Sequence, residues 1–174
     1  MPTREQLSGD FTTFAEARLP DLVRIARVLT GSRDSADDLV QTTLEKAYRS
    51  WRKVHAKPEG EQFAYTRRIL VNSVYDSWRR KQRLRANWGR QSDDEDRPNS
   101  GHGPEHLAVS SRSIDELLAL LAPRERQVIV LRCLADLTEA ETARELGMAV
   151  GTVKSTTARA LTKLRSAAPA PIGI

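Results

Sequence analysis

Residues 138–155 combine the signals that end one helix and start another, and this spacing constrains the fold more than any other feature of the chain. Thr138 is followed three residues later by Glu141, a pair that can form a capping box at a helix start. Ala143 leaves room for a second helix to pack closely, and Gly147, four residues on, can adopt the left-handed conformation that ends a helix. We therefore predict a helix-turn-helix.

The second helix of this pair is predicted to have one apolar and one polar face. Its buried stripe follows helical spacing and comprises Val150, Val153, Leu161 and Leu164. The opposite face, where a recognition helix meets base edges and phosphates, carries Lys154, Ser155, Ala158 and Arg159. An ordinary helical hairpin in a protein core is the alternative. The capping box, the alanine–glycine spacing and the basic outer face favour DNA binding.

The distribution of charge also indicates a nucleic-acid partner. The net charge is +5 and the sequence pI is about 9.7, values that many proteins without such a partner share. Between residues 67 and 90, eight basic side chains stand against Asp76 as the only acid. These basic residues are Arg67, Arg68, Arg79, Arg80, Lys81, Arg83, Arg85 and Arg90.

The sequence lacks the patterns of an enzyme, a metal centre or a membrane protein. His55, His102 and His106 are far apart, and none pairs with Cys133 at metal-ligand spacing. No glycine-rich phosphate loop is present. The single cysteine rules out an intramolecular disulfide, and no apolar run could span a bilayer or serve as a signal peptide. We predict a cytoplasmic, non-enzymatic protein with no cofactor, no metal site and no membrane insertion.

A polar segment divides the chain into two domains. Residues 91–103 contain no aliphatic or aromatic side chain, so they cannot bury enough surface to offset the entropy of ordering. We predict domains at 1–88 and 113–168, a flexible acidic linker at 89–112 and a tail at 169–174. A solvated spacer is favoured over the alternative, an acidic decoy that shields the DNA-binding faces.

Both domains are predicted to be helical, which gives an all-α fold of two small domains. Upstream, helices are expected at 11–29, from Ser35 with a capping box, and at about 61–85, with a break or helix start at Pro20. The inward-facing residues predicted there are Phe14, Leu22, Ile25, Ala26, Leu29, Ala36, Leu39, Val40, Leu44, Ala47, Tyr48, Trp51, Phe63, Leu70, Val74 and Trp78. Downstream, Ser113 can cap a short helix, and Pro123 suits the first turn of the next.

Several motifs resemble one family. Leu-Leu-Ala-Pro-Arg-Glu-Arg-Gln-Val at 120–128 and Gly-Thr-Val-Lys-Ser at 151–155 resemble region 4 of bacterial RNA polymerase sigma factors. Ala-Asp-Asp-Leu-Val-Gln at 36–41 and the stretch at 63–79 resemble region 2. Both regions in order, with only a short linker between them, are typical of the extracytoplasmic-function (ECF) class of the sigma-70 family, possibly an actinobacterial subset.

The resemblance implies three sets of site residues. The predicted −35 DNA contacts in region 4 are Thr152, Lys154, Ser155, Ala158 and Arg159. The predicted −10 DNA contacts in region 2 are Asn72, Asp76, Arg79 and Arg80, with a base pocket near residues 57–60. The predicted polymerase-binding residues are Asp38, Gln41 and Glu45. For Asp76 we favour a simple ion pair with Arg80.

The chain also departs from the family pattern. Ala149 stands where a capping serine is usual, so we expect a poorly capped recognition helix. Thr156 replaces a common arginine, and Thr42 a common acid. For the aromatic side chains of Tyr65 and Trp78, a core position is favoured over a stacking platform for bases.

The implied partners are core RNA polymerase and promoter DNA, with an anti-sigma factor left open and a monomeric state on the polymerase. Two other classes compete. A free-standing, dimeric helix-turn-helix regulator would bind duplex DNA tightly without polymerase and usually carries a ligand or phosphoacceptor domain, which residues 1–85 do not supply. A pure interaction module, such as an anti-sigma antagonist, does not need the basic helix or the recognition face.

Overall fold

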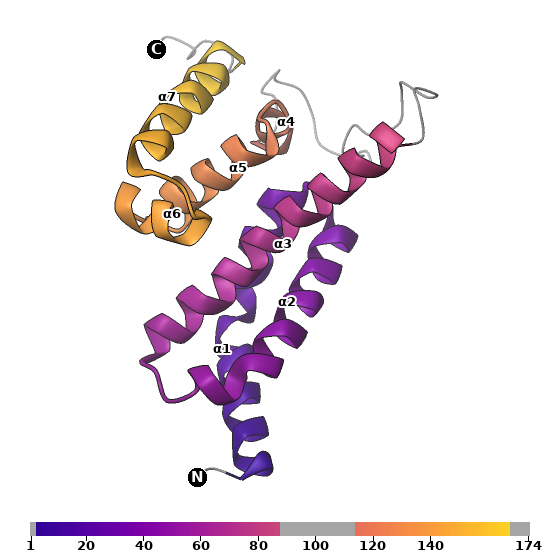
Figure 1. Ribbon diagram of the computed structural model, residues 1–174, viewed down its shortest axis with the longest axis vertical. Helices are drawn as coiled ribbons and strands as arrows, with labels where there is room; N and C mark the ends of the chain where they lie inside the picture. Colours follow the sequence, from indigo (N-terminus) through magenta and orange to yellow (C-terminus); the bar gives the residue numbers. More distant parts are fainter. Residues whose placement is uncertain (1–2, 88–113, 168–174) are drawn as a thin grey trace, which may run out of the picture. The chain divides into compact units, whose positions relative to one another are not determined.

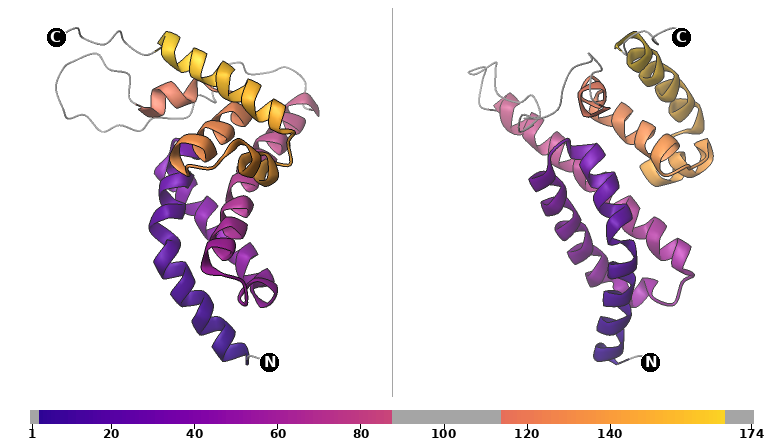
Figure 2. Two further views of the ribbon diagram at one scale, coloured as in Figure 1. Left: turned by 90° about the vertical axis from the view of Figure 1, so that its left-hand side faces the viewer. Right: turned by 180° about the vertical axis from the view of Figure 1, so that it is seen from behind.

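The computed structural model describes residues 3–87 and 114–167. They belong to two compact units, Met1–Lys81 and Gln82–Ile174, which are described separately below. Every described element is helical (Figures 1 and 2), so the all-α prediction is confirmed. None of these helices has the length and apolarity that a membrane crossing requires. The predicted linker and tail lie outside the described residues.

Helix α1 (Arg4–Thr30) opens the N-terminal unit and contradicts the predicted break at Pro20. It begins with a capping box at Thr3 and ends at Gly31, whose φ of 68° is left-handed. Pro20 lies inside the helix. The ribbon of α1 runs without interruption (Figure 2). A proline removes one backbone hydrogen bond, from its own position to the carbonyl four residues earlier. Here both Pro20 and Glu16 are exposed, so water can solvate that carbonyl.

Helices α2 (Arg33–Val54) and α3 (Glu59–Asn87) both start earlier than predicted. The N-cap of α2 is Ser32, whose hydroxyl accepts a hydrogen bond from the backbone N–H of Ser35 at 3.5 Å. Ser35 therefore lies in the first turn and is not the cap. Helix α3 begins directly after Pro58, and the acids in its first turn suit the positive end of the helix dipole.

Aromatic side chains dominate one end of the core of the N-terminal unit. Phe14, Trp51 and Val54 are buried together, and Phe63 and Tyr65 of α3 pack against them, as predicted for Tyr65. Two predicted core residues are wrong: Tyr48 is 42% exposed and Trp78 is 38% exposed. The core also contains polar side chains that the apolar pattern did not select, including the fully buried Thr43 and Thr66. Each of these hydroxyls bonds to the carbonyl four residues before it, which satisfies the buried group.

One residue of the predicted basic surface belongs to the core instead. Arg67 is only 7% exposed, and its guanidinium lies 5.3 Å from the centroid of the Phe63 ring. The guanidinium of Arg18 from α1 lies 5.2 Å from the same ring. The cation–π contact of Arg18 thus stabilises the packing of α1 on the start of α3, whereas that of Arg67 is made within α3.

The C-terminal unit contains α4 (Ile114–Ala119), α5 (Pro123–Ile129), the π-helical turn η1 (Val130–Leu134), α6 (Glu139–Leu146) and α7 (Val150–Ala167). Pro123 occupies the first turn of α5, as predicted, whereas Ser113 lies outside the described residues. The π-helical turn was not predicted. In it, the N–H of Ala135 bonds to the carbonyl of Val130 at 3.0 Å, and Asp136 follows with a φ of 50°. The wider turn ends α5 and redirects the chain toward α6.

Helices α6 and α7 form the predicted helix-turn-helix. The capping box of Thr138 and Glu141 is present, and Gly147 has a φ of 62°. Ala143 is buried, as predicted, and Val153 is completely buried. Val150, however, is 47% exposed because it is the first residue of α7 and lies at the surface end of the turn.

Candidate functional site

The outer face of α7 gathers the residues predicted to contact duplex DNA. The buried face of this helix consists of Val153, Thr156 and Ala160. The exposed residues on the other side include all five predicted contacts, Thr152, Lys154, Ser155, Ala158 and Arg159. The face presents two cations, two hydroxyls and the methyl groups of Thr152 and Ala158. The cations and hydroxyls can bond guanine edges or phosphates, and the methyl groups can contact a thymine methyl.

Two of the departures from the family pattern, Ala149 and Thr156, have local consequences in α7. At the start of α7, the N–H groups of Thr152 and Val153 bond to the carbonyl of Ala149 at 3.0 and 3.1 Å. The alanine side chain has no acceptor for a first-turn N–H, so the start of α7 lacks the side-chain cap that a serine could supply. Thr156 is buried, and its hydroxyl accepts a hydrogen bond from Arg159 at 3.4 Å.

Three consecutive charged residues of α5 hold the other helices of this unit in place. Arg124 donates to the carbonyl of Leu146 at the end of α6 at 2.7 Å. Arg126 donates to the carbonyl of Leu118 in α4 at 2.9 Å. Glu125 accepts from Lys163 of α7 at 2.8 Å. These three residues contribute to the resemblance to sigma region 4, but their contacts with the other helices were not predicted from the sequence.

Burial and charge act in opposite directions on the carboxyl of Glu125. Its side chain is only 10% exposed, and this burial raises its pKa. The hydrogen bond from Lys163, the N–H of Ala122 and the charges of Lys163 and Arg159 lower the pKa, and the result lies below the ordinary value of 4.5. The ionised form of Glu125 therefore stabilises the folded C-terminal unit.

Because the pKa of Glu125 is lower in the folded than in the unfolded state, its contribution is fully present above pH 4.5 and is lost as the pH falls through the folded value. We expect the thermal stability of the C-terminal unit, followed by NMR in the full chain, to decline more steeply below pH 4.5 in the wild type than in Glu125→Gln. At neutral pH the variant should lose about 1.5 kcal/mol, because Lys163 is half exposed. Glu139→Gln is the control for removing one charge; equal slopes for Glu125→Gln and the wild type would contradict the prediction.

The residues predicted to contact the −10 element lie along one face of α3. Asn72 is half-buried, whereas Asp76, Arg79 and Arg80 are exposed, with spacings of three and four residues that align them. The predicted ion pair is wrong: within the described part of α3, no ion pair joins Asp76 to Arg80. The guanidinium of Arg79 instead lies 5.8 Å from the centroid of the Tyr75 ring.

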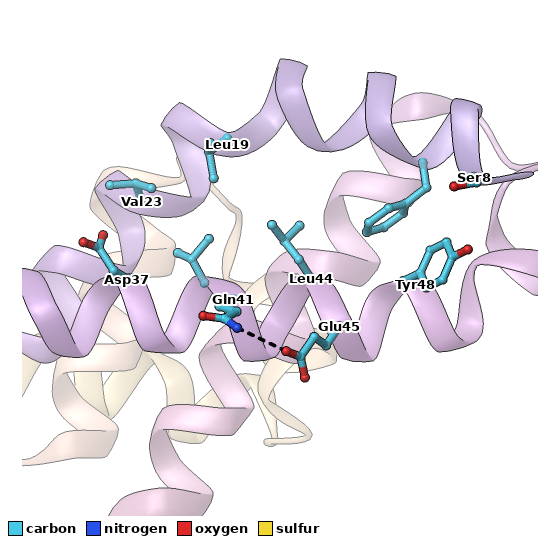
Figure 3. A pocket seen from close by; sticks show the side chains of 10 residues that line it. Ser8, Leu19, Val23, Asp37, Gln41, Leu44, Glu45 and Tyr48 are labelled. Atoms are coloured by element: carbon cyan, nitrogen blue, oxygen red, sulfur yellow. Dashed lines mark hydrogen bonds between the residues drawn. The ribbon is translucent and has the colours of Figure 1, made fainter.

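A groove of about 750 Å³ runs between α1 and α2 beside the predicted polymerase-binding residues (Figure 3). Gln41 and Glu45 line it and are joined by a hydrogen bond of 3.4 Å, whereas Asp38 is exposed but is not part of the lining. Its apolar wall was not predicted. This wall comprises Phe11, Leu19, Val23, Val40, Leu44 and Tyr48.

The described residues contain no group of three or more histidine, cysteine or acidic side chains that could hold a metal ion. Cys133 is exposed, although its apolar sequence context predicts a buried position.

Two family models match the chain in the predicted order. Residues 14–84 match Sigma-70 region 2, and residues 111–164 match Sigma-70, region 4. The RNA polymerase sigma-E factor of Streptomyces coelicolor is 34% identical over 157 residues, which cover 90% of this chain and 84% of that protein. The ECF RNA polymerase sigma factor SigD of Mycobacterium tuberculosis is 28% identical over 172 residues, covering 92% of this chain and 79% of that protein.

The fold also matches a solved structure. The sigma factor RpoE of Bartonella quintana, crystallised with the anti-sigma factor NepR, aligns with a TM-score of 0.65 and 25% identity. The alignment covers 90% of this chain and 95% of that one.

Proposed function

The chain belongs to the sigma-70 family of RNA polymerase sigma factors, in the extracytoplasmic-function class, and from this premise we propose how its two units share the work. Region 2 binds core RNA polymerase and reads the −10 element, and region 4 reads the −35 element. The polymerase supplies the catalysis, and the chain acts in the cytoplasm as one copy on each polymerase. The observation that carries this proposal is that each predicted set of contact residues lies along one face of one helix, α2, α3 or α7, with all but the half-buried Asn72 exposed.

For region 4, the proposal places α7 in the major groove. The support is the exposed face with Lys154, Ser155 and Arg159, which lies opposite buried Val153 and Thr156. A helix in the major groove meets paired bases, so this unit reads duplex DNA.

For region 2, the proposal assigns α3 to the −10 element. Asn72 has an amide that can both donate and accept, which suits the edge of an unpaired base. Arg79 and Arg80 follow two helical turns further on, about 10–12 Å away, where phosphates of the adjoining duplex would lie. Asp76, without its predicted partner, faces the same side.

For polymerase binding, the proposal uses the side of α2 that carries Asp38, Gln41 and Glu45. All three are exposed, and Gln41 and Glu45 border the apolar groove. Apolar surface rimmed by polar groups is typical of protein interfaces. The same surface could be occluded by an anti-sigma factor, the type of partner with which the Bartonella relative was crystallised.

The polymerase-binding face is tested by Asp38→Lys with Gln41→Lys in the full chain. We expect the affinity for core RNA polymerase to fall about tenfold or more, because a lysine pair replaces an acid and an amide at a complementary surface. Stability should change by less than about 0.5 kcal/mol, since both side chains are exposed. Pull-down of core polymerase and run-off transcription on genomic fragments are the measurements.

The matched control is Asp10→Lys with Ala17→Lys, which makes the same change in net charge at exposed positions of α1. It should bind core polymerase like the wild type. Unchanged binding by the Asp38 and Gln41 variant would remove this face from the proposal. If the wild type itself neither bound core polymerase nor directed transcription, and instead bound duplex DNA specifically and tightly alone, the dimeric-regulator alternative would replace it.

A further inference from the structure

An exposed aromatic pair on α3 is not explained by the core. Trp78 is 38% exposed, and its ring stacks on that of Tyr75 with centroids 5.7 Å apart and planes 26° apart. The other described aromatic residues of α3, Phe63 and Tyr65, pack against the core cluster. The stacked pair, unlike a single exposed side chain, forms a flat aromatic surface, and its surroundings indicate which kind of partner would bind it.

The surroundings of this pair are cationic. Arg79 lies 5.8 Å from the Tyr75 ring and is exposed. The further exposed cations on this part of the helix are Arg80, Lys81 and Arg83. Asp76 is the only acid between residues 67 and 87. The partner of the aromatic pair is therefore a polyanion by charge complementarity.

A polyanion that also offers flat apolar faces is a single-stranded nucleic acid. In a duplex the base faces are covered by their neighbours, so a surface indole can reach only the backbone and groove edges. An apolar protein partner would meet a ring surrounded by charges, whereas the centres of protein interfaces are depleted in charged residues. Aromatic rings beside cations are the usual means of holding unpaired bases and their phosphates.

We propose that Trp78 is a stacking platform for an unpaired base of the promoter strand opened at the −10 element. Tyr75 is a positioning residue, because its stacked ring fixes the indole in the orientation that receives the base. Arg79 and its neighbours bind the phosphates at the point where this strand joins the duplex. This inference rests on the proposed function and adds to it a base contact that lies beyond the predicted set.

The test is a double-mutant cycle, in which a substitution at Trp78 is combined with the removal of single bases from the DNA. Holoenzyme reconstituted from core polymerase and the full chain binds fork-junction DNA of a promoter first found by run-off transcription. One abasic site at a time is placed along the single-stranded overhang. Trp78→Ala should weaken binding about 5- to 150-fold, and Trp78→Phe should retain most of it. At one position, the abasic site should weaken wild-type binding but add nothing to the loss in Trp78→Ala.

Leu84→Ala is the matched control, since Leu84 is 55% exposed on the same helix but has no ring to stack. It should bind every probe like the wild type. The inference is overturned if Trp78→Ala has no effect, if it weakens fully duplex probes equally, or if its penalty adds to that of every abasic site. It is also overturned if the variant loses core polymerase in the pull-down. If the proposed function itself were wrong, the result would be different, because the wild-type chain would then not form a holoenzyme with core polymerase.

Discussion

Replacing Trp51 with alanine is expected to unfold the N-terminal unit while the C-terminal unit stays folded. Trp51 is 3% exposed, and its ring lies 4.9 Å from that of Phe14 and 5.1 Å from that of Phe11. Truncation of a buried tryptophan costs about 3–5 kcal/mol. That loss is comparable to the whole stability of a small domain, roughly 5 kcal/mol at the lower end.

Hydrogen exchange of the full chain, followed by mass spectrometry, measures both units at once. Peptides from residues 4–54 should lose protection in Trp51→Ala, and peptides from residues 123–167 should keep it. Trp51→Phe is the matched control: it retains a ring and removes an indole N–H that is buried without a hydrogen-bond partner among the described residues. Because an unsatisfied buried donor costs about 1–3 kcal/mol, this variant should be much less destabilised. Equal loss of protection in both units would contradict their independence.

The sequence predicts this fold well where the signals are local. The capping box at Thr138, the left-handed Gly147 and the position of Pro123 depend on a few adjacent residues, and all three are confirmed. Ser35 and Ser32 show the limit of such signals. Both can cap a helix, and the chain uses Ser32, which lies directly after the turn at Gly31.

The interpretation of Pro20 and Trp78 failed because it required tertiary information. A proline breaks a helix only when packing does not hold both halves, and here Leu22 and Ile25 are buried beyond it, with Phe14 before it. Trp78 continues the apolar spacing of α3 into a stretch, residues 76–84, in which every side chain is exposed, so its pattern predicted burial but its position leaves it exposed.

In the candidate site, too, the sequence predicts what depends on local signals and does not predict what depends on tertiary packing. Helical periodicity was sufficient to place Lys154 and Arg159 opposite Val153, and the structure confirms their exposure. The groove beside Gln41 could not be predicted, because its wall joins residues of α1 and α2 that are distant in sequence. The roles of individual residues at the DNA and at the polymerase stay predictions.

Substitutions at Lys154 and Asn72 are expected to separate the two forms of DNA that the units read. Lys154→Ala should weaken initial binding of holoenzyme to duplex promoter DNA by about 1–3 kcal/mol if the lysine reads a base. Asn72→Ala should leave this closed complex nearly intact but impair strand opening, since an amide can bond an unstacked base only after the strands part. The closed complex is measured by filter binding at low temperature, and opening by permanganate reactivity.

The controls keep each effect tied to its residue. Arg165→Ala removes an exposed cation of α7 that lies about 16 Å from Lys154 along the helix axis, and this variant should bind duplex DNA normally. Ser77→Ala removes an exposed polar group of α3 and should open promoters normally. A pre-melted −10 bubble should restore only part of the loss in Asn72→Ala, because it supplies the strand separation but not the lost contact. If Lys154→Ala and Asn72→Ala lost duplex binding equally, and both opened normally once bound, α3 would be a second duplex-binding surface and single-strand reading would have to be assigned elsewhere.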